Sequence, residues 1–381
     1  MRFPSRSGTA LASIFSIFAL ANTAASDEAP IDPFAVVELE KSIVFRTNIY
    51  AEPPGHGEGV RLAVYQSRDE VGSSKAMEHN FRRLETAVAS ARRFGAQLIS
   101  FPELYLTGYA LDPAMAKRLS EFKDGPFITR ARAVARKHHI AIVLPYAEKA
   151  RDPAGTLRYY DAIALIDEKG KLLESYRKTH LFGIAERINW SAGDGPYRVY
   201  AINGFPVGIL NCYEAEFPEL QRILALQGAK LIVIPTAADN YYTLPDGHRT
   251  KVPYPDISRL LIPAAAYANN LFVAYSNHVG YERLGKDKWR YQGNSVIADP
   301  HGRLLLEADH LQTTLLIADI VPRAFGPTHP ANASYLRDRR PRLYDELTRT
   351  TVTFPYGESF EYPAYPEGEY DYPGFPKRDE R

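Results

Sequence analysis

The sequence predicts an α/β protein in which two β-sheets stack face to face between outer layers of helices, an α-β-β-α sandwich over about residues 60 to 325. Short apolar runs alternate with segments whose apolar residues recur at helical spacing, and hairpins are inserted between these strand-helix units. The chain also divides into two comparable halves, each with two long helical segments. Because several runs are apolar throughout, we expect strands that are buried on both faces.

The first half begins with a predicted strand at 61–65 and a helix at 75–94, in which Met77, Phe81 and Leu84 share one face. The next elements are a strand at 96–101, a helix at 127–138 and a strand at 140–144. A hairpin is expected after them, because the runs 161–166 and 171–176 flank the turn Glu168-Lys169-Gly170.

The second half opens with another hairpin, since Asn203-Gly204 separates apolar runs at 199–202 and 207–210 and is a strong turn signal. The elements predicted after it are a helix at 216–227, a strand at 231–234, a helix at 256–269 and strands at 272–275, 295–298, 303–306 and 315–320.

Both ends of the chain differ from the sandwich. Residues 26–59 mix Pro, Gly and charge and are predicted to form an N-terminal arm, and residues 326–381 form a C-terminal extension. From 356 to 376 this extension is dense in Tyr, Pro, Gly and Glu, and the prolines exclude a helix or central strand. An arm that packs on a partner subunit and a loosely ordered tail both fit this composition.

The first 25 residues have the pattern of a secretory signal peptide, which predicts a secreted or extracytoplasmic protein. Arg2 and Arg6 precede an apolar run at 10–21, and small residues follow it. The run is too short for a stable membrane anchor, although a disordered or mitochondrial leader is the alternative. In a secretory pathway, the sequons at Asn189 and Asn332 would be glycosylation candidates.

Composition excludes several classes of function. The 381 residues carry a net charge of +1, which gives no electrostatic reason to bind nucleic acid or an anionic membrane. Gly-rich phosphate-binding loops are absent, and no later stretch is long and apolar enough for a transmembrane helix. The single cysteine, Cys212, cannot form an intramolecular disulfide or belong to a Cys zinc cluster.

A lone cysteine is usually a small buried hydrophobic residue, but the surroundings of Cys212 favour a nucleophile. An apolar strand ends at Cys212, and a helix begins a few residues later at about Pro218. Such a turn exposes a nucleophile beside main-chain N–H groups that can bind an oxyanion. The nearby helix N-terminus is expected to favour the thiolate.

Two charged residues are placed in the same way. Glu103 follows the predicted strand at 96–101, and Lys178 follows the predicted strand at 171–176. A carboxylate at the end of a buried strand is costly unless it is paired or functional. Because groups at the ends of core strands converge in α/β folds, we expect Glu103, Lys178 and Cys212 to meet in one pocket.

Three ordered segments then resemble the nitrilase superfamily of carbon–nitrogen hydrolases. They are residues 101–109 (FPELYLTGY), 176–181 (YRKTHL) and 211–219 (NCYEAEFPE), and the resemblance extends over roughly residues 60 to 345. It implies the α-β-β-α sandwich of the carbon–nitrogen hydrolase type, assembled as a homodimer or a larger homo-oligomer. It also implies a small-molecule amide as substrate, with neither a metal nor an organic cofactor.

The resemblance also implies roles for individual residues. Cys212 would be the nucleophile and Glu103 the general base, while Lys178 and the main-chain N–H of Tyr213 would stabilise the oxyanion. Many members have a second glutamate eight residues after the lysine, and Glu186 stands there. It would position the substrate and tune Lys178, although a solvated loop carboxylate is the alternative.

The sequences of these motifs are most similar to those of short-chain amidases that act on amino-acid amides or ω-amino amides. Tyr109 and Tyr213, which belong to the first and third motifs, are predicted to contact the substrate. Asp239 would pair with a substrate ammonium group and Tyr241 would shape the pocket, unless Asp239 only caps its loop. A nitrilase acting on a small nitrile and a non-catalytic scaffold stay open as alternatives.

Overall fold

The computed structural model describes residues 42–241, 253–285, 287–329, 333–349, 351–353 and 359–361. The predicted signal peptide, the sequon residue Asn332 and most of the Tyr-rich extension lie outside these residues. Within them, no helix combines the length and apolar character needed to cross a bilayer.

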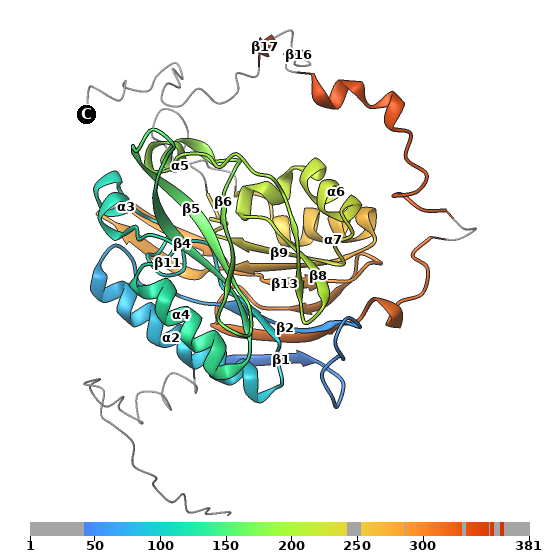
Figure 1. The fold of residues 1–381 in the computed structure, drawn as a ribbon, viewed down its shortest axis with the longest axis horizontal. Helices are drawn as coiled ribbons and strands as arrows, with labels where there is room; N and C mark the ends of the chain where they lie inside the picture. Colours follow the sequence, from blue (N-terminus) through green and yellow to red (C-terminus); the bar gives the residue numbers. More distant parts are fainter. Residues whose placement is uncertain are drawn as a thin grey trace, which may run out of the picture.

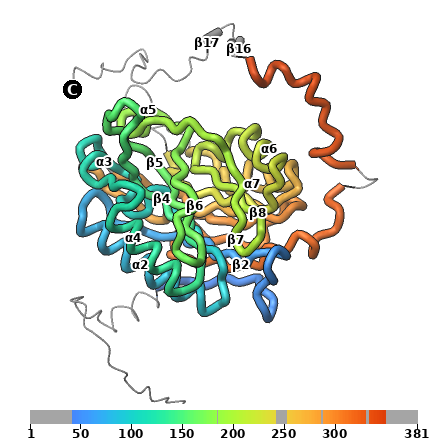
Figure 2. Tube along the Cα trace, viewed as in Figure 1, coloured from blue at the N-terminus to red at the C-terminus, as the bar shows by residue number. Residues whose placement is uncertain are grey.

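A seven-stranded mixed sheet, which we call the first sheet, has the order β1-β15-β2-β3-β4-β5-β6. Its strands are Val44–Asn48 (β1), Thr314–Ile320 (β15), Val60–Gln66 (β2), Leu98–Ser100 (β3), Ala141–Arg151 (β4), Leu157–Ile166 (β5) and Leu172–Arg177 (β6). β2, β3 and β4 are parallel, whereas β15 runs antiparallel to β2 and brings the two ends of the domain together (Figure 2).

A second sheet of six strands has the order β14-β13-β10-β9-β8-β7. Its strands are Leu304–Glu307 (β14), Val296–Ala298 (β13), Phe272–Asn277 (β10), Leu231–Thr236 (β9), Phe205–Ile209 (β8) and Val199–Ile202 (β7). The predicted turn between β7 and β8 is confirmed, since Asn203 and Gly204 both have positive φ, 52° and 71°. These are the torsions that a two-residue hairpin turn of type I′ requires.

Helices cover the outer face of each sheet. α2 (Ser74–Arg93) and α4 (Pro126–His138) lie together on the first sheet, and α6 (Pro218–Leu226) and α7 (Ile257–Asn269) lie on the second (Figure 1). In β2, Ala63 and Tyr65 pack toward the helices while Leu62 and Val64 pack toward the other sheet. Each inner strand is therefore buried on both faces, and the four-layer α-β-β-α sandwich is confirmed.

α2 shows why the helical periodicity was informative. The side chain of Ser73 caps the helix by accepting the N–H of Ala76 at 3.0 Å, and Arg92 and Arg93 lie in its last turn. Phe81 and Leu84 on its inner face are completely buried. Capping and cations near the C-terminus stabilise the ends, and burial of the apolar face holds the helix on the sheet.

Several elements do not follow from the sequence patterns. β1 lies in the predicted N-terminal arm. Its sequence VFRTN does not itself indicate a strand, and the segment becomes one by pairing with β15. The others not predicted are α3 (Pro113–Leu119), α5 (Gly183–Asn189), the hairpin of β11 (Val279–Leu284) and β12 (Asp287–Gln292), the 3-10 helices η1 (Cys212–Glu216), η2 (Pro322–Ala324), η3 (Pro341–Leu343) and η4 (Asp345–Thr348), and the pair β16 (Thr351–Thr353) and β17 (Ser359–Glu361).

Candidate active site

The three residues predicted to converge come from three strand ends in two sheets. Glu103 follows β3 and Lys178 follows β6, both of the first sheet, and Cys212 follows β8 of the second. Lys178 Nζ lies 2.6 Å from Glu103 Oε1, which confirms that these two side chains meet. Both are completely buried.

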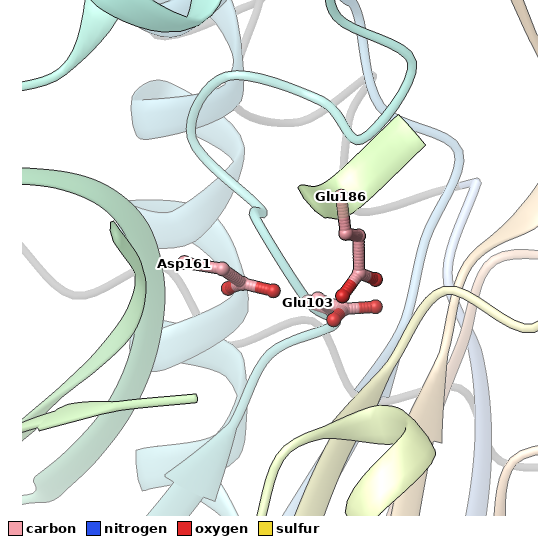
Figure 3. Close-up of side chains that lie close together, drawn as sticks. All are labelled: Glu103, Asp161 and Glu186. Carbon is pink, nitrogen blue, oxygen red and sulfur yellow. The ribbon is translucent and has the colours of Figure 1, made fainter. Parts of the chain in front are cut away.

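Lys178 is surrounded by three carboxyl groups, and we call these four residues the Lys178 cluster. Besides Glu103, its ammonium group lies 2.8 Å from Glu186 Oε1 and 3.7 Å from Asp161 Oδ2. Figure 3 shows the carboxyl groups of Glu103, Asp161 and Glu186 turned toward one another. The cation that these carboxyl groups bind is thus the chain's own ammonium group.

Charge and burial act against each other in the cluster. Burial by itself lowers the pKa of Lys178, but the surrounding carboxylates outweigh it and hold the pKa well above its ordinary value. Burial raises the pKa of Asp161 well above normal, and the charge of Glu103 adds to this. Burial also raises the pKa of Glu186, although Lys178 opposes the shift. Lys178 therefore stays charged in a region with surplus carboxyl groups.

Cys212 lies in a tight turn that brings it beside this cluster. Its φ is +48°, a left-handed conformation that is rare for residues with a side chain and is often found at functional sites. The cysteine is half-buried, and its sulfur lies 3.0 Å from the hydroxyl of Thr236. Burial and the charge of Glu103 raise the pKa of the thiol well above normal against the effect of Lys178. These effects oppose the thiolate, which the helix N-terminus was expected to favour.

A buried glutamate that the sequence analysis did not single out joins the lysine and cysteine segments. Glu214 Oε1 accepts the main-chain N–H of Thr179 at 2.8 Å, and Glu214 Oε2 accepts that of Asn211, also at 2.8 Å. The hydroxyl of Tyr176 donates to the same carboxylate at 2.7 Å. One side chain thus fixes the residues beside Lys178 and Cys212 relative to each other.

His278, which has no role in the sequence analysis, holds the main chain of Glu103. Its Nε2 lies 2.6 Å from the carbonyl oxygen of Glu103, and its Nδ1 lies 2.9 Å from Asp69 Oδ2. Both neighbours accept hydrogen bonds, so only the doubly protonated ring satisfies them together. Burial lowers the pKa of His278, but Asp69 and Glu282 outweigh it and the pKa is raised.

Glu186 is a buried member of the site, so the alternative of a solvated loop carboxylate is wrong. It is only 2% exposed and lies on α5. The hydroxyl of Tyr109 donates to its Oε1 at 2.7 Å, and the N–H of Phe182 donates to its Oε2 at 2.7 Å. With Lys178 as a third donor, both oxygens of the Glu186 carboxylate accept hydrogen bonds.

The loop that carries Tyr109 is fixed by the hairpin of β11 and β12. Glu282 Oε2 accepts the N–H groups of Tyr109 and Ala110 at 2.9 and 2.7 Å, and the hydroxyl of Tyr291 donates to it. The ring of Trp289 meets that of Tyr109 edge to face, with centroids 6.1 Å apart. The hairpin therefore supports Glu186 through Tyr109.

The remaining predicted substrate contacts are Tyr213, Asp239 and Tyr241. Tyr213 is half-buried, and its ring packs edge-on against Phe182 and Phe217 at centroid distances of 5.2 and 4.9 Å. Asp239 Oδ1 accepts the main-chain N–H of Arg290 at 3.1 Å and that of Tyr241 at 3.4 Å. These bonds support the loop-capping interpretation of Asp239, and its contact with a substrate stays a prediction.

Comparison with known proteins identifies the family to which this fold belongs. The carbon–nitrogen hydrolase family profile matches residues 61–329, so the chain belongs to that family, within the nitrilase superfamily, and is an enzyme of this class. A hydrolase encoded in the region 5′ of pqqF in Pseudomonas protegens is 36% identical over 71% of this chain and 86% of its own length. An (R)-stereoselective amidase from Pseudomonas sp. is 30% identical over 71% and 89%.

Solved structures give the same family. An amidase of the nitrilase superfamily from Nesterenkonia superposes with a TM-score of 0.63 at 29% identity, covering 78% of this chain and all of the amidase. In another structure of that amidase, with a TM-score of 0.59, 27% identity and coverage of 78% and 99%, the acetamide moiety of fluoroacetamide is bound covalently to the active-site cysteine.

Proposed function

We propose that this protein hydrolyses a small carboxamide to a carboxylate and ammonia through a thioester on Cys212. The observation that carries the proposal is a half-buried thiol beside a completely buried Lys178–Glu103 pair. A buried ion pair is expensive to maintain for stability alone, whereas an ammonium held at a fixed place can stabilise a developing oxyanion.

The first half-reaction forms the thioester. Glu103 accepts the thiol proton while the Cys212 sulfur attacks the amide carbon, and the electron pair of the C=O bond moves onto oxygen. Lys178 and the N–H of Tyr213 stabilise that charge. The C–N bond then breaks, the proton returns from Glu103 to the leaving nitrogen, and ammonia departs.

The second half-reaction releases the product. Water gives a proton to Glu103 and attacks the thioester carbon, and the C–S bond breaks as the proton passes to sulfur. The raised pKa of the Cys212 thiol supports a mechanism in which the base acts during the attack, rather than one that begins with a resting thiolate.

We infer that the favoured substrate is an amide with a short acyl group, such as an amino-acid amide or an ω-amino amide. The rings of Phe182 and Phe217 pack against Tyr213, the residue after Cys212, and this packing supports a small acyl group. Relatives named citrullinase, from Francisella tularensis, and N-carbamoylputrescine amidase, from Arabidopsis thaliana, are 31% and 29% identical, which is a reason to test carbamoyl compounds as well.

The test is ammonia release from five compounds: an amino-acid amide, an ω-amino amide, a neutral aliphatic amide, an N-carbamoyl amino acid and a nitrile. Wild type and Cys212→Ala are compared, with circular dichroism to check that both are folded. We expect cysteine-dependent release from amides. Release from the nitrile alone would assign a nitrilase, and ammonia release that survives Cys212→Ala would exclude the thioester mechanism.

A further inference from the structure

Asp161 is a carboxyl group of the Lys178 cluster that has no part in the reaction above. Asp161 lies in the buried part of β5, which begins at Tyr160, and its side chain is completely buried beside Glu103. The side-chain amide of Asn211, next to Cys212, donates to Asp161 Oδ1 at 3.0 Å. The other oxygen, Oδ2, lies 3.7 Å from Lys178 Nζ, which is too long for a hydrogen bond.

Two buried oxygen atoms in this cluster lack a hydrogen-bond donor. Among the residues that the structure describes, neither Asp161 Oδ2 nor Glu103 Oε2 has a hydrogen-bond partner. A buried carboxylate oxygen left without a donor is costly. Carboxyl oxygens of Asp161 and Glu103 nevertheless lie within 4.8 Å of each other, beside the same ammonium group. A hydrogen bond between the two side chains is among the causes that raise the pKa of Asp161. A single proton between them would satisfy both oxygens.

The charges in the cluster lead to the same conclusion. Lys178 contributes one positive charge against the three carboxyl groups of Glu103, Asp161 and Glu186, and all four side chains are buried. Glu186 has three donors and is satisfied as a carboxylate. Asp161 has one donor and stands opposite another carboxylate, so it is the group for which ionisation is least favourable.

We propose that Asp161 is a neutral carboxylic acid that donates a hydrogen bond to Glu103 Oε2 and so orients the base for Cys212. Asp161 is then a positioning residue, and this role rests on the proposed function of Glu103. Lys178 binds Oε1 of Glu103 and Asp161 binds Oε2, which fixes the plane of the carboxylate. Each carboxylate oxygen keeps a second lone pair, so Glu103 can still accept the thiol proton.

The protonation state has a spectroscopic test that does not require turnover. In protein labelled with ¹³C at the aspartate carboxyl carbon, a protonated aspartate gives an isotope-shifted C=O band in the infrared spectrum. We expect this band in wild type and its loss in Asp161→Asn. The same loss in a Cys212→Ala background would support the proposal independently of activity. An unchanged band after Asp161→Asn would overturn it.

The positioning role has a kinetic test with a conservative variant. Asparagine keeps the acceptor for Asn211 and supplies a permanent N–H donor to Glu103, whereas alanine supplies neither. We expect Asp161→Asn to retain kcat/KM within about threefold, and Asp161→Ala to lose about 10- to 100-fold, mainly in kcat. Equal losses in both variants would contradict the proposal, because a structural or ionised Asp161 predicts that result.

A pH profile separates this role from packing. In wild type, kcat/KM should decrease as the pH rises through the pKa of Asp161, since the ionised group repels Glu103 and donates nothing. The charged groups that face Asp161 are Glu103, Lys178 and Glu186, and all remain in Asp161→Asn. That variant should lack this part of the alkaline decrease, and an unchanged alkaline decrease would overturn the proposal. If Asp161→Ala does not fold, the comparison of wild type with Asp161→Asn still decides whether ionisation of Asp161 causes the alkaline decrease.

Discussion

Two buried ionic groups in this molecule are built on different principles. Arg61 in β2 forms a two-point ion pair with Asp319 in β15, with distances of 2.7 and 2.9 Å. The same guanidinium donates to the carbonyl oxygens of Phe94 and Tyr50 at 2.8 Å. One cation faces one carboxylate there, whereas the Lys178 cluster places one cation among three carboxyl groups. Two oxygens of the cluster have no donor among the residues that the structure describes.

The difference is the one expected between a structural ion pair and the proposed catalytic site. Arg61 joins β2 and β15, and its charge and hydrogen bonds are matched by fixed partners. Lys178 has surplus carboxyl groups beside a half-buried thiol, so protons in its neighbourhood can move between groups. Perturbed pKa values of this kind are typical of catalytic sites.

The largest effect that tests this distinction is expected for Lys178→Met. The variant removes the only ammonium group of the cluster, and we expect kcat/KM for the best amide to decrease by about 1,000-fold because oxyanion stabilisation is lost. Steady-state ammonia release measures this change, and circular dichroism reports whether the fold persists. A folded variant with activity near wild type would show that the cluster is structural.

The matched variant, Arg61→Met, should lose stability but keep its activity. Removing one partner of a buried ion pair costs about 3–5 kcal/mol, because Asp319 is left buried without its cation. Urea unfolding should show this loss, whereas kcat/KM of the folded protein should stay within about twofold, since Arg61 does not touch the site. Adding Asp319→Leu should restore part of the stability. A selective loss of activity would contradict the structural role.

The pH dependence of the free energy of unfolding should reflect the protonation of the carboxyl groups in the Lys178 cluster. The pKa values of Asp161 and Glu186 are raised by folding, so these groups contribute stability at low pH that is lost as the pH rises through their folded-state pKa values. Within that range, the free energy of unfolding should decrease by about 1.4 kcal/mol per pH unit for each proton involved. Asp161→Asn should reduce this slope in urea unfolding at several pH values, and a slope equal to that of wild type would contradict the prediction.

A smaller effect is expected at Asp239, an acidic group that caps main-chain N–H groups. If it also pairs with a substrate ammonium, Asp239→Asn should raise KM for an amino amide about tenfold and leave KM for a neutral amide unchanged. Glu216→Gln is the comparison variant, since Glu216 lies four residues after Cys212 and accepts the hydroxyl of Tyr254 at 2.6 Å. A selective change only in that variant would assign the ammonium to Glu216 instead.

Much of the fold could be predicted because its signals are local. The periodicity of α2, the apolar strands and the Asn203-Gly204 turn each determine their own conformation. β1 could not, because its conformation depends on a partner distant in the sequence. The hairpin of β11 and β12 is local, but its runs VGYERL and DKWRYQ are rich in charge and carry no apolar strand signal. β1 pairs with residues 270 positions later, as Val44 with Thr314 shows.

The same limit applies to the site. Glu103, Lys178 and Cys212 follow strands in recognisable motifs, and the meeting of Glu103 with Lys178 was predictable. Asp161 begins an apolar run in the sequence, and a charged residue there was the only local signal of its burial. His278 and Glu214 had no such signal, because their importance arises from main-chain groups that only the folded chain brings to them.

The contacts around Glu103 also bear on how the protein unfolds. Its N–H bonds to the carbonyl of Thr236 in β9 at 3.2 Å, and Ser100 meets Ser276 in β10 at 2.8 Å just before it. Residues of the second sheet therefore hold the main chain at Glu103, which follows a strand of the first sheet. The two sheets cannot separate or slide without displacing Glu103, so activity and β-structure should disappear in one cooperative denaturation step.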